Sequence, residues 1–188
     1  MPANIIGTTA AETFSVRGTE LSGGTIDGGG ETDVLELRDF FYPTLFDFTG
    51  LTRFQGIEVI RGVIEVAQIR IRADQLANVT TIDSYDVQHV DQVMIVGGSI
   101  DLRTINLLGS LEIRPETANA EVAVANFATA SLIKSEGVRG IHAKLETGIL
   151  TDAQRVALYD RGIDKITDAS GVTTAAFGPV LTGLHGIL

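Results

Sequence analysis

The chain has 188 residues, of which 24 are acidic and 14 basic, and its formal net charge is −10. This acidic balance argues against a nucleic-acid partner and against an anionic membrane surface, because both need basic patches on the protein. The sequence contains no cysteine and no 18-residue apolar run, so disulfides, thiolate chemistry and a membrane-spanning segment are not expected.

Residues 1–37 form a glycine-rich region with short alternations of apolar and polar side chains. Such alternation is typical of half-buried strands. The opening residues lack a basic segment followed by a long apolar one, so a cleavable secretory signal is not expected. A shift of nine residues places Gly18–Ile26 over Asp27–Leu35, with Ile26 and Leu35 both inward. A nine-residue period with glycine turns indicates a solenoid whose turns can hold Ca²⁺.

Residues 38–54 are aromatic and contain five of the eight phenylalanines. We interpret this segment as an insertion or plug over the core, since large exposed aromatic patches are rare on soluble proteins. An aromatic binding patch is the alternative.

Residues 55–146 carry pairs of apolar side chains at short, nearly regular intervals that restart near residues 57, 79, 100 and 122. The implied repeat is about 21 to 22 residues, with three short strands in each turn. These intervals are too short for crossover helices, and the segment lacks hairpin turn pairs such as Asn-Gly. We therefore predict an all-β protein, a parallel β-helix (β-solenoid) with short N-terminal glycine turns.

A helix is predicted over 151–161, within a helix–strand cap at 147–176. Thr151 suits the first cap, Asp152 the first turn, Arg161 the last turn and Gly162 the stop. A shorter helix is predicted over 73–77. Residues 177–188 are apolar and turn-rich, and we interpret them as a linker within a longer chain.

The N-terminal region resembles the calcium-binding repeats of bacterial RTX-type (haemolysin-type) proteins. Gly28–Glu36 matches their nonapeptide at both leading glycines, at the aspartate (Asp33) and at the aliphatic position (Leu35), whereas Glu31 stands in place of a glycine. The resemblance implies Ca²⁺ held by Asp27, Glu31 and Asp33. It also implies a secreted bacterial adhesin-like protein, extracellular or on the cell surface, that is exported by a C-terminal signal.

One group of side chains suggests a different chemistry. Parallel β-helices include polysaccharide lyases and epimerases, which use carboxylates and basic residues gathered on one face. The residues that could form such a group are Asp83, Asp86, Asp101, Arg103 and Arg114. We also expect that Asp83 and Asp101 could stack in neighbouring turns, or else face water separately. The histidines are scattered, and no nucleophile or phosphate-loop motif is present.

These observations favour a non-enzymatic structural protein, with no catalytic residues, over a carbohydrate-active enzyme. The expected role is a rigid spacer, surface-layer or adhesin segment that Ca²⁺ steadies. Cell-surface carbohydrate and other copies of the chain are the expected partners, the latter through end-to-end or lateral assembly, because open sheet edges offer unpaired strands.

Overall fold

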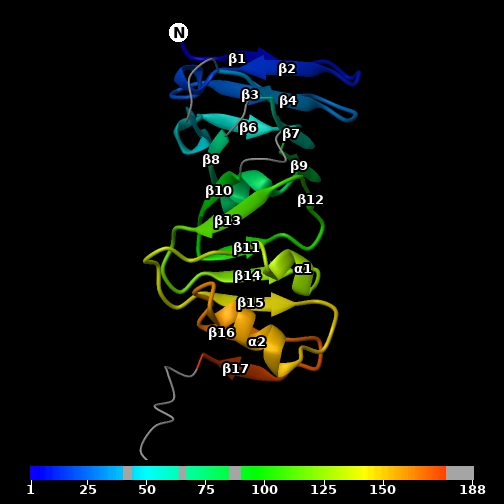
Figure 1. Cartoon of the computed structure of the whole chain (residues 1–188). Helices are drawn as coiled ribbons and strands as arrows, with labels where there is room; N and C mark the ends of the chain where they lie inside the picture. The colour runs from blue at the N-terminus through cyan, green and yellow to red at the C-terminus, as the bar shows by residue number, and fades with distance from the viewer. Residues whose placement is uncertain (40–43, 64–66, 85–89, 177–188) are drawn as a thin grey trace, which may run out of the picture.

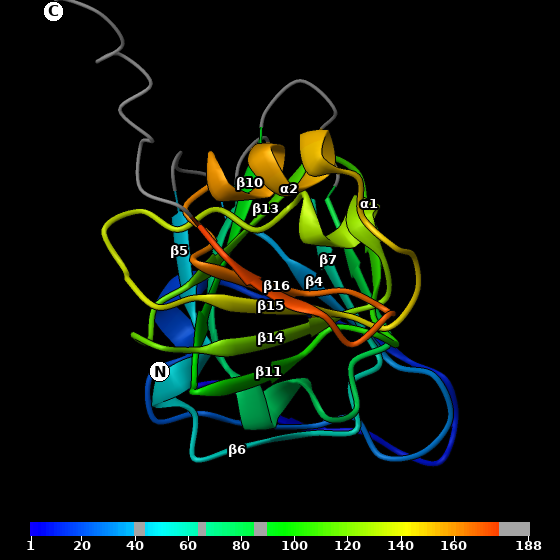
Figure 2. The same ribbon diagram turned by 90° about the horizontal axis from the view of Figure 1, so that it is seen from below.

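The structure is a computed structural model that describes residues 1–39, 44–63, 67–84 and 90–176. Its strands are stacked one above another, from β1 (Asn4–Ile6) at one end to β17 (Thr173–Ala175) at the other (Figure 1). Within the described residues they form four sheets, of three, four, five and five strands. Viewed along the stack, strands of different sheets surround a common interior (Figure 2).

Two of the sheets contain β1 and β2, and we call them sheets A and B. Neighbouring strands in both are parallel and come from successive passes of the chain. Sheet A consists of β1, β3 (Thr25–Asp27) and β6 (Arg53–Gln55). Sheet B consists, in spatial order, of β12 (Asn106–Leu108), β9 (Thr81–Asp83), β7 (Val59–Gly62), β4 (Val34–Leu37) and β2 (Thr13–Val16).

The other two sheets, C and D, begin further along the chain. Sheet D ends in the antiparallel pair β16 and β17, whereas its other pairs are parallel. Sheet C consists of β13 (Leu111–Pro115), β10 (Asp91–Val96), β8 (Ala67–Arg72) and β5 (Thr44–Asp47). Sheet D consists of β11 (Ser99–Asp101), β14 (Glu121–Val124), β15 (His142–Leu145), β16 (Lys165–Thr167) and β17.

The core is built from inward-facing aliphatic side chains that line up across the sheets. In sheet B, Leu35, Ile60 and Ile82 are register partners, and each is at most 1 % exposed. Side chains alternate between the two faces of a strand, so the residues between these positions face outward. Full burial of one such side chain stabilises the fold by about 1.5 to 3 kcal/mol.

Short helices connect the strands at several corners. The helix predicted after Thr151 is confirmed as α2 (Asp152–Tyr159): the Thr151 hydroxyl accepts a hydrogen bond from the Gln154 amide at 3.3 Å, and the Gln154 side chain accepts one from the Thr151 amide at 3.0 Å. The segment predicted helical at 73–77 forms a 3₁₀ turn. The remaining helices are α1 (Phe127–Ala130), η1 (Gly18–Glu20), η2 (Phe48–Gly50) and η3 (Ala73–Leu76).

The predicted all-β parallel β-helix is wrong. The described residues form four sheets, one of which contains an antiparallel pair, and include helices, and they do not make a closed solenoid. The prediction relied on the spacing of apolar side chains over residues 55–146, but within that segment the chain forms the helix α1 instead of a strand. There the Asn126 side chain accepts a hydrogen bond from the Thr129 amide at 3.2 Å, and this cap favours a helical turn. The antiparallel β17 follows a tight turn that apolar spacing does not record.

The nine-residue period does not determine strand pairing either. Ile26 was predicted to repeat at Leu35, but its register partners are Ile5 and Phe54, in sheet A. Leu35 belongs to sheet B, where it pairs with Phe14. The glycine turns therefore connect two different sheets, and stacking occurs between whole passes of the chain.

Part of the aromatic segment contributes to the core. Phe46 in β5 and Phe48 in η2 are fully buried, and the Phe48 ring meets that of Phe54 edge to face with centroids 5.3 Å apart. Residues 40–43 of that segment, and the proposed linker at 177–188, lie outside the described residues.

Candidate functional site

The three predicted calcium ligands have different surroundings. Asp27 ends β3 and faces outward, where its carboxylate lies 2.8 Å from the Arg53 guanidinium and 3.2 Å from the Gln55 amide nitrogen. Glu31 is exposed and has a positive φ of 64°. The side chain of Asp33 points into the protein and is completely buried.

Asp33 holds the backbone of the preceding pass. Its Oδ1 accepts a hydrogen bond from the Glu12 amide at 2.8 Å, while its Oδ2 is buried without a hydrogen-bond partner. A cation such as Ca²⁺ takes six to eight oxygen ligands. The structure does not bring Asp27, Glu31 and Asp33 together, and no group of three acidic or histidine side chains that could hold a metal occurs among the described residues.

Acidic residues directly before three strands of sheet B form a column of structural contacts. Glu12 precedes β2, Asp33 precedes β4 and Glu58 precedes β7. The Asp33 amide donates to Glu58 Oε2 at 2.8 Å, just as the Glu12 amide donates to Asp33. This column satisfies the backbone amides just before the strands begin, and hydrogen bonds to a carboxylate are stronger than neutral ones. In the sequence each of these carboxylates directly precedes a short apolar strand, but only the pairing of the strands places the three in one column.

The structure separates the residues considered for polysaccharide chemistry. Asp83 lies in sheet B and contacts Arg61 at 3.1 Å, whereas Asp101 lies in sheet D and contacts Arg103 at 2.6 Å. The two aspartates therefore do not stack. Arg114 belongs to sheet C, and Asp86 lies outside the described residues.

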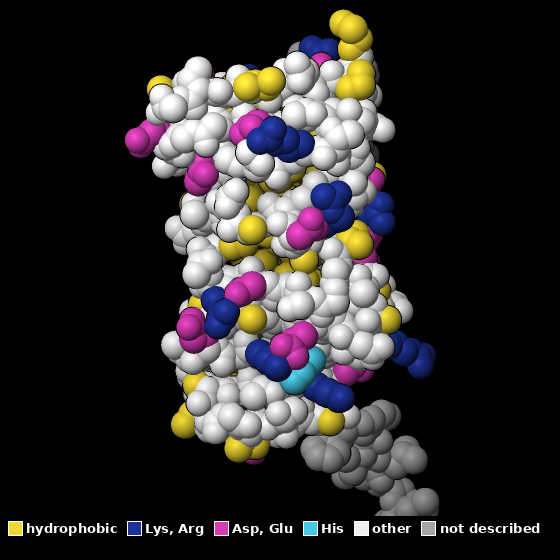
Figure 3. Space-filling view, turned by 180° about the vertical axis from the view of Figure 1, so that it is seen from behind, with side chains coloured by type: hydrophobic (Ala, Val, Ile, Leu, Met, Phe, Trp, Pro, Cys, Tyr) yellow, Lys and Arg dark blue, Asp and Glu magenta, His cyan; other side chains and the backbone are white. Residues whose placement is uncertain are grey.

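Ion pairs between neighbouring strands are a more regular feature of the surface. Space-filling views show oppositely charged side chains next to each other at several heights of the stack (Figure 3). Burial raises the pKa of Asp47, but the Thr49 hydrogen bonds and the Arg70 guanidinium outweigh this and hold it below its ordinary value. Ion pairs of this kind connect successive passes in every sheet. In sheets A, B, C and D, respectively, they are Asp27–Arg53 at 2.8 Å, Arg61–Asp83 at 3.1 Å, Asp47–Arg70 at 3.3 Å and Glu121–Lys144 at 2.6 Å.

A hollow of about 420 Å³ lies on the outer face of sheet C. Arg70, Met94 and Arg114 form one cross-strand row there. Each arginine is bound to carboxylates: Arg70 contacts Glu116 at 2.7 Å, and Arg114 contacts Glu112 at 2.5 Å. Because these guanidinium groups are neutralised, the hollow does not resemble an anion site.

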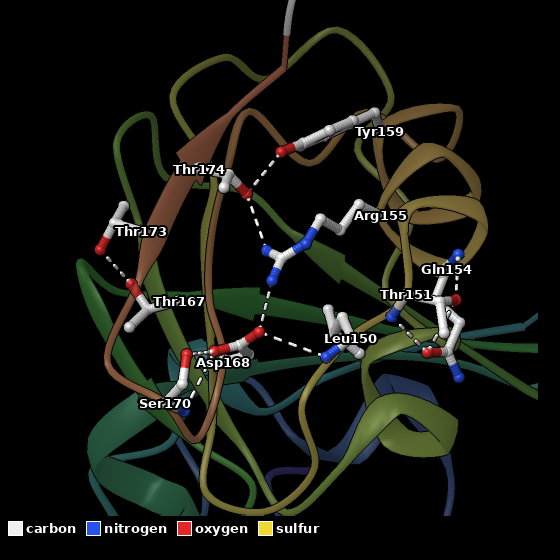
Figure 4. A network of polar contacts seen from close by, with 10 residues as sticks. All are labelled: Leu150, Thr151, Gln154, Arg155, Tyr159, Thr167, Asp168, Ser170, Thr173 and Thr174. Atoms are coloured by element: carbon white, nitrogen blue, oxygen red, sulfur yellow. Dashed lines mark hydrogen bonds and ion pairs between the residues drawn. The ribbon is translucent and has the colours of Figure 1, made fainter.

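A buried polar network fixes α2 against the end of sheet D (Figure 4). Arg155, on α2, is ion-paired with Asp168, whose side chain is fully buried. Arg155 also donates to the Thr174 hydroxyl at 2.9 Å, and Tyr159 donates to the same oxygen at 2.7 Å. The Ser170 hydroxyl is the main cause that lowers the pKa of Asp168, with further contributions from backbone amides and Arg155.

No protein-family model, curated protein or solved structure matches the chain. No helix in the described part is both long and apolar enough to cross a membrane.

Proposed function

We propose that this chain is a non-enzymatic structural segment that acts as a rigid spacer. The observation that supports this role is the position of the polar contacts, which hold neighbouring parts of the stack together. The acidic column of sheet B and the cross-strand ion pairs connect successive passes of the chain, and the network at α2 fixes this helix to the end of sheet D. Individual exposed pairs contribute only about 0 to 1 kcal/mol, so their main effect is on register.

An extracellular or cell-surface location fits this role. The resemblance of Gly28–Glu36 to repeats of secreted bacterial proteins supports it. An adhesin-like protein would need such a spacer to hold a binding module away from the cell. Contact with cell-surface carbohydrate is part of this proposal, and a binding assay on a panel of polysaccharides tests it. The appearance of unsaturated products in that assay would indicate a lyase instead.

Rigidity can be measured directly, because the chain has no native cysteine. Ile6→Cys and Val172→Cys place spin labels at exposed positions near opposite ends of the stack. We expect pulsed electron paramagnetic resonance to give one narrow distance distribution. A control pair at Leu108→Cys and Ile149→Cys reports on the intervening region. A broad distribution for the end-to-end pair would contradict a spacer.

Calcium binding remains a prediction and has its own test. A ligand that binds only the folded state raises the melting temperature. The comparison uses EDTA-treated protein with and without millimolar Ca²⁺, in the wild type and in Glu31→Gln, whose side chain is exposed and outside the core. A rise that the variant loses supports the site, and an unchanged melting temperature in the wild type argues against it.

Self-association is the proposed partner interaction. β1 and β2 are the outer strands of sheets A and B, and they lie at the same end of the stack. Outer strands can pair with another copy of the same surface. Ile6→Pro removes an amide from this exposed edge, because the neighbouring Ile5 is the residue that faces β3. Light scattering should show a dimer that this variant loses, whereas a monomeric wild type would contradict the proposal.

A further inference from the structure

Sheet B ends at a groove of about 670 Å³ between β12 and α1. In the aliphatic column of this sheet, Ile60 and Ile82 are at most 1 % exposed. Leu107 is the register partner of Ile82 in the last strand, and it is only half-buried because no further strand covers it. The apolar column is therefore open on the side of the groove.

The backbone of Leu107 is also available. On one side of it, the Asn106 amide donates to the Thr80 carbonyl at 2.7 Å, and on the other the Leu108 carbonyl accepts from Ser84 at 3.0 Å. Successive residues of a parallel strand bond to opposite neighbours. The N–H and C=O of Leu107 therefore point away from β9, and they make no hydrogen bond to any residue within 1–39, 44–63, 67–84 or 90–176.

The groove walls determine the charge of a ligand. Arg103 is the charged residue of the lining, and its guanidinium is bound to Asp101 at 2.6 Å. The other lining groups are hydroxyls, amides and small or apolar side chains, and so an uncharged ligand is complementary to them. The hydroxyl and amide residues of the lining are Thr80, Thr81, Thr104, Asn106, Asn126 and Thr129.

We propose that this groove binds an extended, uncharged peptide segment, which adds to β12 as the next strand of sheet B. The segment would exchange main-chain hydrogen bonds with Leu107 and place an apolar side chain beside it, as in other cases of strand addition. A second copy of the chain is a poorer fit, because α1 closes the far side of the groove, which therefore admits one strand but not the stacked layers of a whole subunit. The proposal adds a binding role to the structural one and does not depend on it.

The test uses a pentapeptide of alternating valine and threonine, with valine at its centre and both ends capped. Titration followed by NMR should shift the Leu107 amide resonance, and saturating peptide should slow hydrogen exchange of that amide by about tenfold or more. Proline in place of the central valine removes the donor amide, so affinity should fall by about tenfold or more.

Two protein variants test the location. Ala128 lies on the exposed side of α1 and lines the groove, so Ala128→Arg should block it. Val156→Arg places the same side chain on an exposed position of α2, outside the groove, and should leave affinity unchanged. The proposal would be overturned if the pentapeptide does not bind at millimolar concentration, or if both variants bind it equally.

Discussion

At the level of single residues, glycine directly follows each strand of sheet A. Gly7 follows β1, Gly28 follows β3 and Gly56 follows β6. A Cβ atom at Gly7 would lie 1.8 Å from the Gly28 carbonyl oxygen, and one at Gly28 would lie 1.8 Å from that of Gly56. The passes approach one another so closely that no other residue fits, so close backbone stacking explains this part of the glycine pattern without a bound ion.

We therefore expect Gly28→Ala to destabilise the protein by about 3 kcal/mol, because the methyl group must displace the backbone of the next pass. Gly23→Ala is the matched control. Its φ is +69°, but no atom lies within 4 Å of the added Cβ, so the cost should be about 1 kcal/mol from backbone strain alone. Urea denaturation of both variants measures the difference, and equal losses would contradict the stacking argument.

At the level of elements, α2 shows what sequence patterns can and cannot determine. Its start at Thr151 was predictable, because capping chemistry is local. The face that it buries was not: Val156 is 56 % exposed, whereas Leu158 is fully buried. The ion pair between Arg155 and Asp168 connects residues from different elements, and only the fold brings them together.

Loss of Arg155 should be costly, since it leaves a buried carboxylate without its partner. We expect Arg155→Ala to lower the free energy of unfolding by about 3 to 5 kcal/mol. Arg38→Ala removes an arginine whose contact with Glu36 is on the surface, and it should cost at most about 1 kcal/mol. Thermal and chemical denaturation measure both, and similar losses would mean that the network does not stabilise this end.

The network also predicts a dependence on pH. The pKa of Asp168 in the folded protein lies below its ordinary value of 3.8. As pH falls, the unfolded state therefore binds a proton before the folded state does. The stability that Asp168 contributes is present above the unfolded pKa and is lost as pH falls through the folded pKa. Comparison with Asp168→Asn isolates this contribution. The advantage of the wild type should shrink below about pH 4, and a constant difference would contradict the prediction.

Sequence periodicity predicted many strand positions but not how the elements combine. The pairs Val93 with Ile95 and Val122 with Val124 are buried in β10 and β14, as their spacing indicated. In β7 the neighbouring residues Val59 and Ile60 are both β-branched, and Ile60 is the one that faces the core. Alternation cannot choose between two neighbouring β-branched residues. It also cannot show that the carboxylates of Asp27 and Asp33 face different surroundings, since that depends on which sheets their strands join.

On the scale of the whole molecule, stability should vary along the stack. β10 lies between β8 and β13, whereas β1 has β3 as its neighbour and is the outer strand of sheet A. Amides that open only in global unfolding exchange most slowly. We expect the amides of Val93 and Ile95 to exchange about 100-fold more slowly than that of Ile5. Equal rates by NMR would instead indicate that the stack opens as one unit.

The reversal of chain direction at β17 has a further consequence for assembly. A filament grows when subunits join through two different, complementary surfaces, because each added subunit then leaves a new copy of the binding surface free. Sheets A and B begin with parallel strands, whereas sheet D ends in an antiparallel one, so the β17 end does not continue the parallel stacking of the β1–β2 end. Association through the β1–β2 end uses the same surface on both molecules and is complete after one step. The protein should therefore form discrete pairs in solution and remain free of fibres.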